Sequence, residues 1–126
     1  SAQVYWFDVS SNLLTGPIPS SIGSVDCSIM ILNNNLLTGT LPSSIGSIVG
    51  PNAETGEMAV FDVSINQLTG PLPSSLGSLG VYEIFSIAHN NFSGTMPSSL
   101  CGAIGIACCA LNCKPYWGLL THSPVN

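Results

Sequence analysis

Apolar residues recur along this chain in a pattern that repeats every 23 to 31 residues. The stretch "NLLTGPIPSSIGS" at residues 12–24 returns with small changes at 35–47, 66–78 and 90–102. Counted from the Asn that opens each copy, six positions are apolar in all four copies: minus eight, minus five, minus three, plus two, plus six and plus ten. A period in the low twenties predicts a solenoid, because one such unit cannot bury its own apolar face.

The spacing of these positions also predicts the elements of each repeat. Positions minus five and minus three alternate as in a short strand with one buried face. A Gly at plus four suits a tight bend or a positive φ, and a Pro at plus seven ends strand pairing and starts a turn. Each repeat is expected to run from strand to bend, then to a second extended piece and a loose helical turn. The predicted repeats span 4–26, 27–57, 58–81 and 82–102.

Together the positions spell L-x-x-L-x-L-x-x-N-x-L-x-G-x-I-P-x-x-L-G. This pattern resembles the plant-type leucine-rich repeat, which is found in receptor-kinase ectodomains, polygalacturonase-inhibiting proteins and a leucine-rich antifreeze protein. The resemblance covers residues 4–102. It implies a right-handed solenoid with a parallel β-sheet on the concave side and, on the convex side, a short second sheet with 3-10 or loop turns.

The same resemblance implies a structural role for the Asn that opens each copy. An amide group offers two donors and two acceptor lone pairs, which suits bonding to the backbones of adjacent turns. The side chains are expected to point inward and form a ladder made of Asn12, Asn35, Asn66 and Asn90.

Recognition is expected on the concave face of the predicted sheet, from strand residues that do not enter the core. The row at minus six is a continuous apolar stripe, and such a patch usually marks a contact surface. The alternative is that the apolar segment "KPYWGLLTHSPVN" folds back over it. The predicted contact residues are Trp6, Ile29, Val60 and Ile84 at minus six, Asp8, Ile31, Asp62 and Ser86 at minus four, and Asn33 and Ser64 at minus two.

No catalytic or metal site is expected. Asp8 and Asp62 fall two strands apart, so their backbones are separated by about 10 Å, too far to share one cation. The Ser residues belong to repeating positions, and His89 precedes a turn as a solvated residue. The sequence predicts no enzyme activity and no cofactor.

Composition narrows the class of partner. Charged residues make up 6% of the chain, and one basic residue stands against six acidic ones, for a net charge of −5. Nothing here neutralises phosphates, which argues against nucleic acid. The apolar runs are too short to span a bilayer. Such a chain stays soluble through hydroxyls and amides, attached sugar or association with copies of itself.

Cysteine placement predicts a special C-terminal segment. Cys27 falls in the core at minus eight and is expected to be a buried free thiol. Four more cysteines follow the last repeat, and a bond between the adjacent Cys108 and Cys109 is disfavoured by geometry. Two pairings stay open, and a zinc site is their competitor. The segment 103–126 is therefore predicted to be a Cys-rich cap and tail, with its disulfides drawn from Cys101, Cys108, Cys109 and Cys113.

Two further features point to the outside of the cell and to loop contacts. Asn91 begins "NFS", an acceptor for an N-linked glycan in a secreted chain. The second repeat carries an insertion at 49–57, expected to bulge where the chain enters the next strand. Loops of this kind readily acquire contacts but are also often neutral. The candidate contact residues are Pro51, Asn52, Glu54 and Glu57.

The N-terminal end of the solenoid is expected to expose core residues at Val4, Phe7 and Val9, and something must cover them. Either residues upstream do so, or another protomer docks head to tail, a contact that propagates into a fibre if the rotation does not close.

These observations favour a secreted, extracellular, non-enzymatic module for protein contact. The most specific form of this hypothesis is a protein that self-associates head to tail into a larger assembly or fibre. One alternative is a ligand-recognition ectodomain or an inhibitor of wall-degrading enzymes. Another is ice binding, suggested by rows of hydroxyls at plus three and plus five: Thr15, Thr38, Thr69 and Ser93, beside Thr40 and Thr95, with Pro17 and Pro71 breaking the second row.

Overall fold

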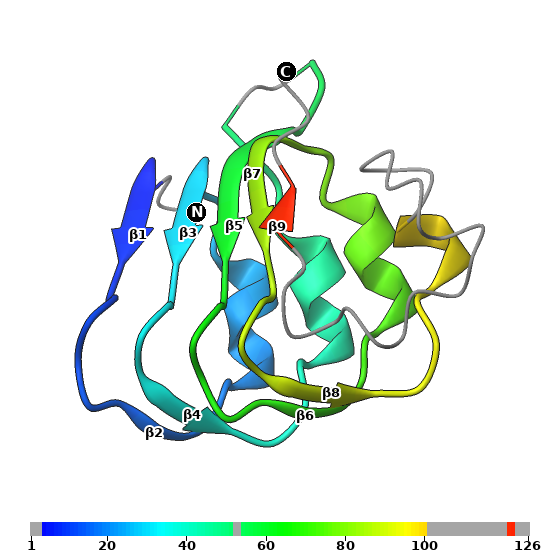
Figure 1. Cartoon of the computed structure of the whole chain (residues 1–126). Helices are drawn as coiled ribbons and strands as arrows, with labels where there is room; N and C mark the ends of the chain where they lie inside the picture. Colours follow the sequence, from blue (N-terminus) through cyan, green and yellow to red (C-terminus); the bar gives the residue numbers. More distant parts are fainter. Residues whose placement is uncertain (1–3, 52–53, 101–120, 123–126) are drawn as a thin grey trace.

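The computed structural model describes residues 4–51, 54–100 and 121–122. Strands, bends and helical turns of successive repeats stack in register, so each kind of element forms a row along the molecule (Figure 1). The predicted solenoid is therefore confirmed. The predicted cap at 103–126 and its cysteines lie outside the described residues, apart from a short strand at Thr121–His122.

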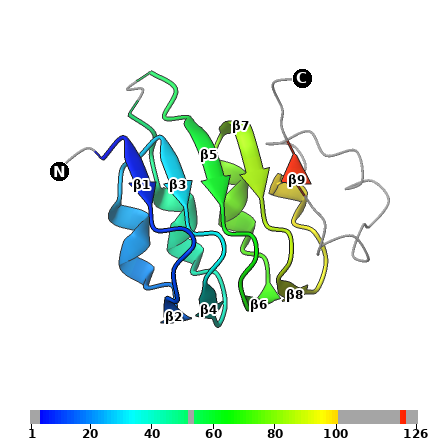
Figure 2. The same cartoon turned by 60° about the vertical axis from the view of Figure 1, so that its left-hand side comes forward.

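The larger sheet has five strands in the order β1-β3-β5-β7-β9. The first four run parallel and β9 is antiparallel to β7, which places it at the outer edge (Figure 2). The strands are β1 (Trp6–Asp8), β3 (Ile29–Ile31), β5 (Met58–Asp62), β7 (Val81–Ser86) and β9 (Thr121–His122).

A second strand row follows each bend. It consists of β2 (Thr15–Pro17) paired with β4 (Leu36–Thr38), and β6 (Thr69–Pro71) paired with β8 (Asn91–Ser93). Hydrogen bonds from Gln67 N–H to Leu37 O and from Thr69 N–H to Gly39 O, both 2.8 Å, connect the two pairs. The bend before this row uses Gly with positive φ at position plus four, 75° to 83°, as the sequence predicts.

Three 3-10 turns lie on the side opposite the larger sheet, as η1 (Ser20–Ser24), η2 (Ser43–Ser47) and η3 (Ser74–Ser78) (Figure 1). A Pro with φ near −70° precedes each turn. The turns are joined by a row of short hydrogen bonds, each 2.6 Å, from a Ser hydroxyl to a carbonyl of the preceding repeat: Ser44 to Ser20, Ser75 to Ser43, and Ser99 to Ser74.

Gly at position plus eleven lets these turns approach closely. A Cβ on Gly23 would lie 2.3 Å from the Ser44 carbonyl oxygen, and one on Gly46 would lie 2.3 Å from that of Ser75. Real Cβ atoms do not reach such distances, so the following repeat requires glycine here. The fourth repeat carries Cys101 at the same position.

The core lies between the two strand rows and the 3-10 turns. Phe61 and Phe85, neighbours in the sheet register, are fully buried and stack with ring centroids 5.6 Å apart. Burial is complete in the middle repeats and weaker in the first, where Val4 is 37% exposed and Leu14 is 43% exposed. The first repeat has no repeat before it among the described residues.

The register at position minus eight differs from the alignment of the repeats. The alignment sets Tyr82 against Met58, but Val81 pairs with Met58 and is buried. The register shifts between Met58 and Val60, where β7 holds one residue more than β5. Such a bulge moves the start of β7 by one residue, and the spacing of apolar residues along the sequence does not predict it.

The Asn side chains form a hydrogen-bonded ladder between repeats. Asn66 Oδ1 accepts from Leu37 N–H at 3.1 Å, while its Nδ2 donates to Leu32 O at 3.0 Å, both in the preceding repeat. Its Nδ2 also lies within bonding distance of Val63 O and Ser64 O, both at 3.2 Å, in its own repeat. Asn35 and Asn90 repeat this arrangement.

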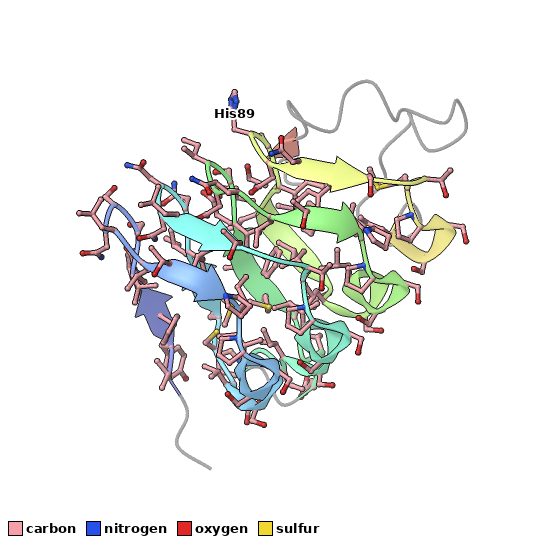
Figure 3. The ribbon with its side chains drawn as sticks, turned by 90° about the horizontal axis from the view of Figure 1, so that it is seen from below. His89 is labelled. Carbon is pink, nitrogen blue, oxygen red and sulfur yellow. The ribbon has the colours of Figure 1, made fainter. Side chains whose placement is uncertain are left out.

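The residue before each ladder Asn has a left-handed backbone conformation, with φ between 53° and 55°. Three of these residues are Ser11, Asn34 and His89, and the fourth is Ile65, a β-branched residue that disfavours this region. Figure 3 shows the His89 side chain projecting away from the ribbon. The Ile65 side chain is 47% exposed.

The ladder predicts unequal costs for removing an Asn. Asn66→Ala leaves backbone groups of two repeats without partners, so we expect the free energy of unfolding to fall by about 3 kcal/mol. Asn12→Ala removes bonds within one exposed repeat only and should cost about 1 kcal/mol. Urea denaturation followed by circular dichroism measures both, and equal losses would contradict the ladder.

The strained backbone predicts a stabilising change. Ile65→Asn places at this φ a residue that adopts the left-handed region readily, and we expect the free energy of unfolding to rise by about 1 kcal/mol. Leu13→Gln is the matched control, because Leu13 is 82% exposed and Gln67 occupies its position in the third repeat. If both variants gain equally in thermal unfolding, the effect is loss of exposed apolar surface and not relief of strain.

Candidate functional site

The sheet register places the predicted apolar stripe in one line across the concave face. Trp6 lies beside Ile29, Ile29 beside Val60, and Val60 beside Ile84. Trp6 is 63% exposed and Ile84 is 41% exposed, with Ile29 half-buried between them. The stripe is therefore accessible mainly at its two ends.

Several predicted contact residues are not accessible. Val60, Ser64 and Ser86 are each no more than 9% exposed. Val60 lies on a central strand with the larger Ile29 and Ile84 on either side. Ser64 donates its hydroxyl to Asp62 Oδ1 at 2.6 Å, and Ser86 pairs with Thr121 of β9. The accessible part of the concave surface is therefore smaller than predicted. The predicted contact residues that are exposed or half-buried are Trp6, Asp8, Ile29, Ile31, Asn33, Asp62 and Ile84.

Two carboxylates flank Ile31 in the neighbouring row, since Asp8 pairs with Ile31 and Ile31 pairs with Asp62. Each accepts the N–H of the residue two positions on, Ser10 or Ser64, at 2.9 Å. The Ser10 hydroxyl and backbone N–H lower the pKa of Asp8, and the Trp6 side chain adds to this effect. Asp8 therefore stays ionised beside the exposed indole.

The two carboxylates lie on β1 and β5, with Ile31 of β3 between them. In the part of the chain that the structure describes, no group of three potential metal ligands occurs. Within the same residues, no helix has the length and apolarity needed to cross a membrane.

The insertion leaves the repeat after buried Ile48 and rejoins it at β5. Its base is narrow: Gly50 N–H donates to Gly56 O at 2.9 Å, and a Cβ on Gly50 would collide with the Glu57 carbonyl. Glu54 and Glu57 are exposed and Pro51 is half-buried, while Asn52 lies outside the described residues. The loop presents negative charge near the start of β5.

The N-terminal end face holds an apolar hollow of about 200 Å³. Its lining includes Phe7 and Val9, which are half-buried, and Ile18 and Ile22, which are buried. Val4, the third predicted end-face residue, is exposed and does not line the hollow. The other lining residues are Leu14, Pro17, Pro19, Leu32 and Leu37.

The hydroxyl rows on the second strand row are staggered. Thr15 pairs with Leu36 and Thr38 pairs with Pro17, so Thr15 and Thr38 do not lie opposite one another. The same offset occurs where Thr69 pairs with Asn91. A straight ladder of Thr, the arrangement that would favour ice binding, is absent from β2, β4, β6 and β8.

Asn91, the predicted glycan acceptor, lies on β8 with its side chain exposed. Cys101, Cys108, Cys109 and Cys113 lie outside the described residues, so their pairing stays a prediction. Sequence reasoning missed the hydroxyl row formed by Ser44, Ser75 and Ser99, although its regular spacing signals it. It also missed the left-handed residues before each ladder Asn.

Comparisons with known proteins agree with this architecture. A family model described as Leucine Rich Repeat matches residues 3–25 and 83–103. No curated protein sequence matches the chain significantly.

Several solved structures resemble the chain. The ectodomain of the plant membrane receptor kinase GASSHO1/SCHENGEN3 from Arabidopsis thaliana, in complex with CASPARIAN STRIP INTEGRITY FACTOR 2, is 34% identical with a TM-score of 0.65, over 77% of this chain and 11% of that one. The BIR3–SERK2 complex from Arabidopsis thaliana gives 31% identity and a TM-score of 0.59, over 75% and 48%. The PEPR1–AtPEP1 structure gives 29% and 0.65, over 82% and 14%.

The repeat pattern, the stacked architecture and these comparisons make the chain a leucine-rich-repeat protein of the plant type. It spans less than half the length of each of the three structures compared.

Cys27 is a free thiol and fully buried in the core. Burial raises its pKa from 9.0 to about 11, with a further contribution from the Asp26 charge. At pH 8 we expect Cys27 to resist iodoacetamide in the folded chain and to react in urea, as read by mass spectrometry of its peptide. Rapid native labelling would contradict this burial.

The same shift sets a dependence of stability on pH. Because the folded state holds the thiol proton more tightly, the raised pKa of Cys27 contributes to the free energy of unfolding. This contribution is complete below pH 9 and is lost as the pH rises through 11. Cys27→Val, which takes the residue found at this position in the first repeat, should remove that component of the alkaline loss in urea titrations.

Proposed function

We propose that this protein is an extracellular, non-enzymatic recognition module that binds an extended peptide or protein segment on its concave face. One observation carries the proposal: exposed apolar side chains at Trp6 and Ile84 share a rigid parallel sheet with the carboxylates of Asp8 and Asp62. The repeating positions form the Asn ladder and the core. The strand residues on the concave face are not among them, so they can differ between repeats.

The chemistry of the surface selects the ligand. An apolar stripe with its ends exposed fits side chains spaced along a segment that crosses the strands. The neighbouring row offers two carboxylates and no cation, and Lys114 is the single Lys or Arg of the whole chain. A ligand that combines apolar side chains with Lys or Arg is therefore complementary to this face.

The compared structures support this class of function. Each of them names two components: a plant membrane receptor kinase ectodomain with CASPARIAN STRIP INTEGRITY FACTOR 2, PEPR1 with AtPEP1, and BIR3 with SERK2. One of these chains is described as the ectodomain of a plant membrane receptor kinase, which supports an extracellular location here. A glycan on the exposed Asn91 accords with that location.

Head-to-tail self-association, the sharper form of protein contact that the sequence suggested, is less well supported by the geometry. A copy docking on the C-terminal side would have to pair with the outer edge of β7. That edge is already paired with β9 through Phe85 and Ser86. We therefore favour ligand recognition over assembly into a fibre.

A displayed library of random twelve-residue peptides tests the proposal. We expect enrichment of sequences with apolar residues and at least one Lys or Arg, and binding that weakens as salt is added. Trp6→Ala should weaken the selected peptides at least tenfold in isothermal titration, because an exposed aromatic anchor dominates small interfaces.

Leu13→Gln is the matched control, since it removes an exposed apolar side chain between β1 and β2, outside the concave sheet. If the selected peptides bind Trp6→Ala and Leu13→Gln as tightly as they bind the original chain, recognition lies outside the concave face at Trp6. No enrichment at all would remove the support for a peptide ligand.

A further inference from the structure

The two carboxylates on the concave face are held in the same way. Asp8 and Asp62 each begin the sequence Asp-Val-Ser, and each Oδ1 accepts the N–H of the Ser two residues on at 2.9 Å. The hydroxyl of the same Ser also bonds the carboxylate, at 2.6 Å in the case of Asp62. The described residues include no Lys or Arg that could neutralise either group. Both carboxylates therefore have fixed orientations and keep acceptor capacity for a ligand.

The distance between these carboxylates follows from the strand order. Asp8 pairs with Ile31, and Ile31 pairs with Asp62, so the two lie on β1 and β5 with β3 between them (Figure 2). Neighbouring strands are about 4.8 Å apart, which separates the two residues by about 9.6 Å. Ile31 supplies an apolar surface between them and no charge. A segment laid across the strands therefore meets two anions at this spacing.

The spacing distinguishes between the conformations that an extended segment can adopt. Side chains of a β-strand alternate in direction, so those on one side are about 6.7 Å apart and then about 13.4 Å apart. Neither distance matches that between the carboxylates. A polyproline II helix has three residues per turn and a rise of about 3.1 Å, so residues i and i+3 lie on one side about 9.3 Å apart. An α-helix comes close only after two turns, at about 10.8 Å.

The surroundings of the two carboxylates differ. Beside Asp8, on the same strand, the Trp6 side chain is 63% exposed. A planar guanidinium that pairs with Asp8 can stack on this indole, which a compact ammonium does less well. Beside Asp62, the equivalent residue is Val60, which is buried. The Asp8 side therefore favours Arg, whereas Asp62 accepts either Lys or Arg.

We propose that the concave face binds a segment in the polyproline II conformation with basic residues at i and i+3, one at each carboxylate, and with Arg at Asp8. This inference rests on the proposed function and specifies the ligand of the same surface. The two residues between the basic pair point away from the carboxylate row. Proline suits both positions, because its fixed φ lowers the cost of ordering the segment on binding.

Short peptides that differ only in spacing test the proposal. The series is Leu-Arg-Pro-Arg-Leu, Leu-Arg-Pro-Pro-Arg-Leu and Leu-Arg-Pro-Pro-Pro-Arg-Leu, with both ends blocked and a fluorescent label for anisotropy titrations. We expect the two-proline peptide to bind roughly threefold more tightly than the others, the scale of one exposed ion pair. Replacing Arg by 2,4-diaminobutyrate should increase this preference, because a shorter side chain cannot compensate for the wrong spacing.

Two further peptides test the conformation and the Arg preference. Leu-Arg-Gly-Gly-Arg-Leu keeps the spacing in sequence but is not pre-organised, so it should bind more weakly than the two-proline peptide. Leu-Lys-Pro-Pro-Lys-Leu should also bind more weakly, and Trp6→Leu should remove most of the difference between the Arg and Lys peptides. A difference that Trp6→Leu leaves unchanged would contradict the placement of Arg at Asp8.

Moving a carboxylate tests the geometry from the side of the protein. The double variant Asp8→Ile with Ile31→Asp keeps composition and net charge but sets the carboxylates on adjacent strands, about 4.8 Å apart. It should lose the preference for two intervening residues. Asp8→Asn and Asp62→Asn should each weaken the two-proline peptide about fivefold. Glu57→Gln is the matched control, because it removes one exposed carboxylate from the insertion loop and should change this affinity by less than about twofold.

Thermal unfolding followed by circular dichroism shows whether each variant folds, and the spacing series on the original chain decides the question where one does not. Library peptides that bind at Trp6 without any preference for the two-proline spacing would overturn the polyproline II ligand and leave the proposed function intact. Unchanged affinity in both Asp8→Asn and Asp62→Asn would do the same. If neither the library nor the series yields binding, the proposed function fails together with this inference.

Discussion

Each turn of this solenoid has backbone donors and acceptors that only its neighbours can satisfy, and the amide of one Asn per repeat connects them. Asn66 bonds groups of two repeats with one side chain. Buried backbone groups without partners are costly, so the strand row, the bend and the second strand row all depend on this contact. The core then fills the space that the ladder fixes.

The sequence predicts the regular part of the structure well because that part repeats. Every apolar position recurs four times, so the four parallel strands, their register from Trp6 to Asp8 and its equivalents, and the row of Asn follow from alignment alone. Departures from the repeat are harder to predict. The bulge in β7 makes Val81 the partner of Met58, and Ile65 accepts a strained φ because the next residue, Asn66, must enter the ladder.

Accessibility was the weaker part of the site prediction. Alternation correctly assigns residues to the concave side, but it does not say which of them their neighbours cover. Val60 on the central strand β5 and Ser64 just after it are buried by larger or bonded neighbours, whereas Trp6 on the edge strand is largely exposed. Strand order, side-chain size and the antiparallel β9 decide this, and none of them is a property of a single repeat.

Glycine at position plus eleven has a consequence for the shape of that concave side. A solenoid curves when its convex elements take up more width than its strands. Here a Cβ on Gly23 or Gly46 would lie 2.3 Å from a carbonyl oxygen of the next turn, so the 3-10 turns are closely packed. We therefore expect the strand row to curve little, which leaves the proposed binding side open to a segment laid across it.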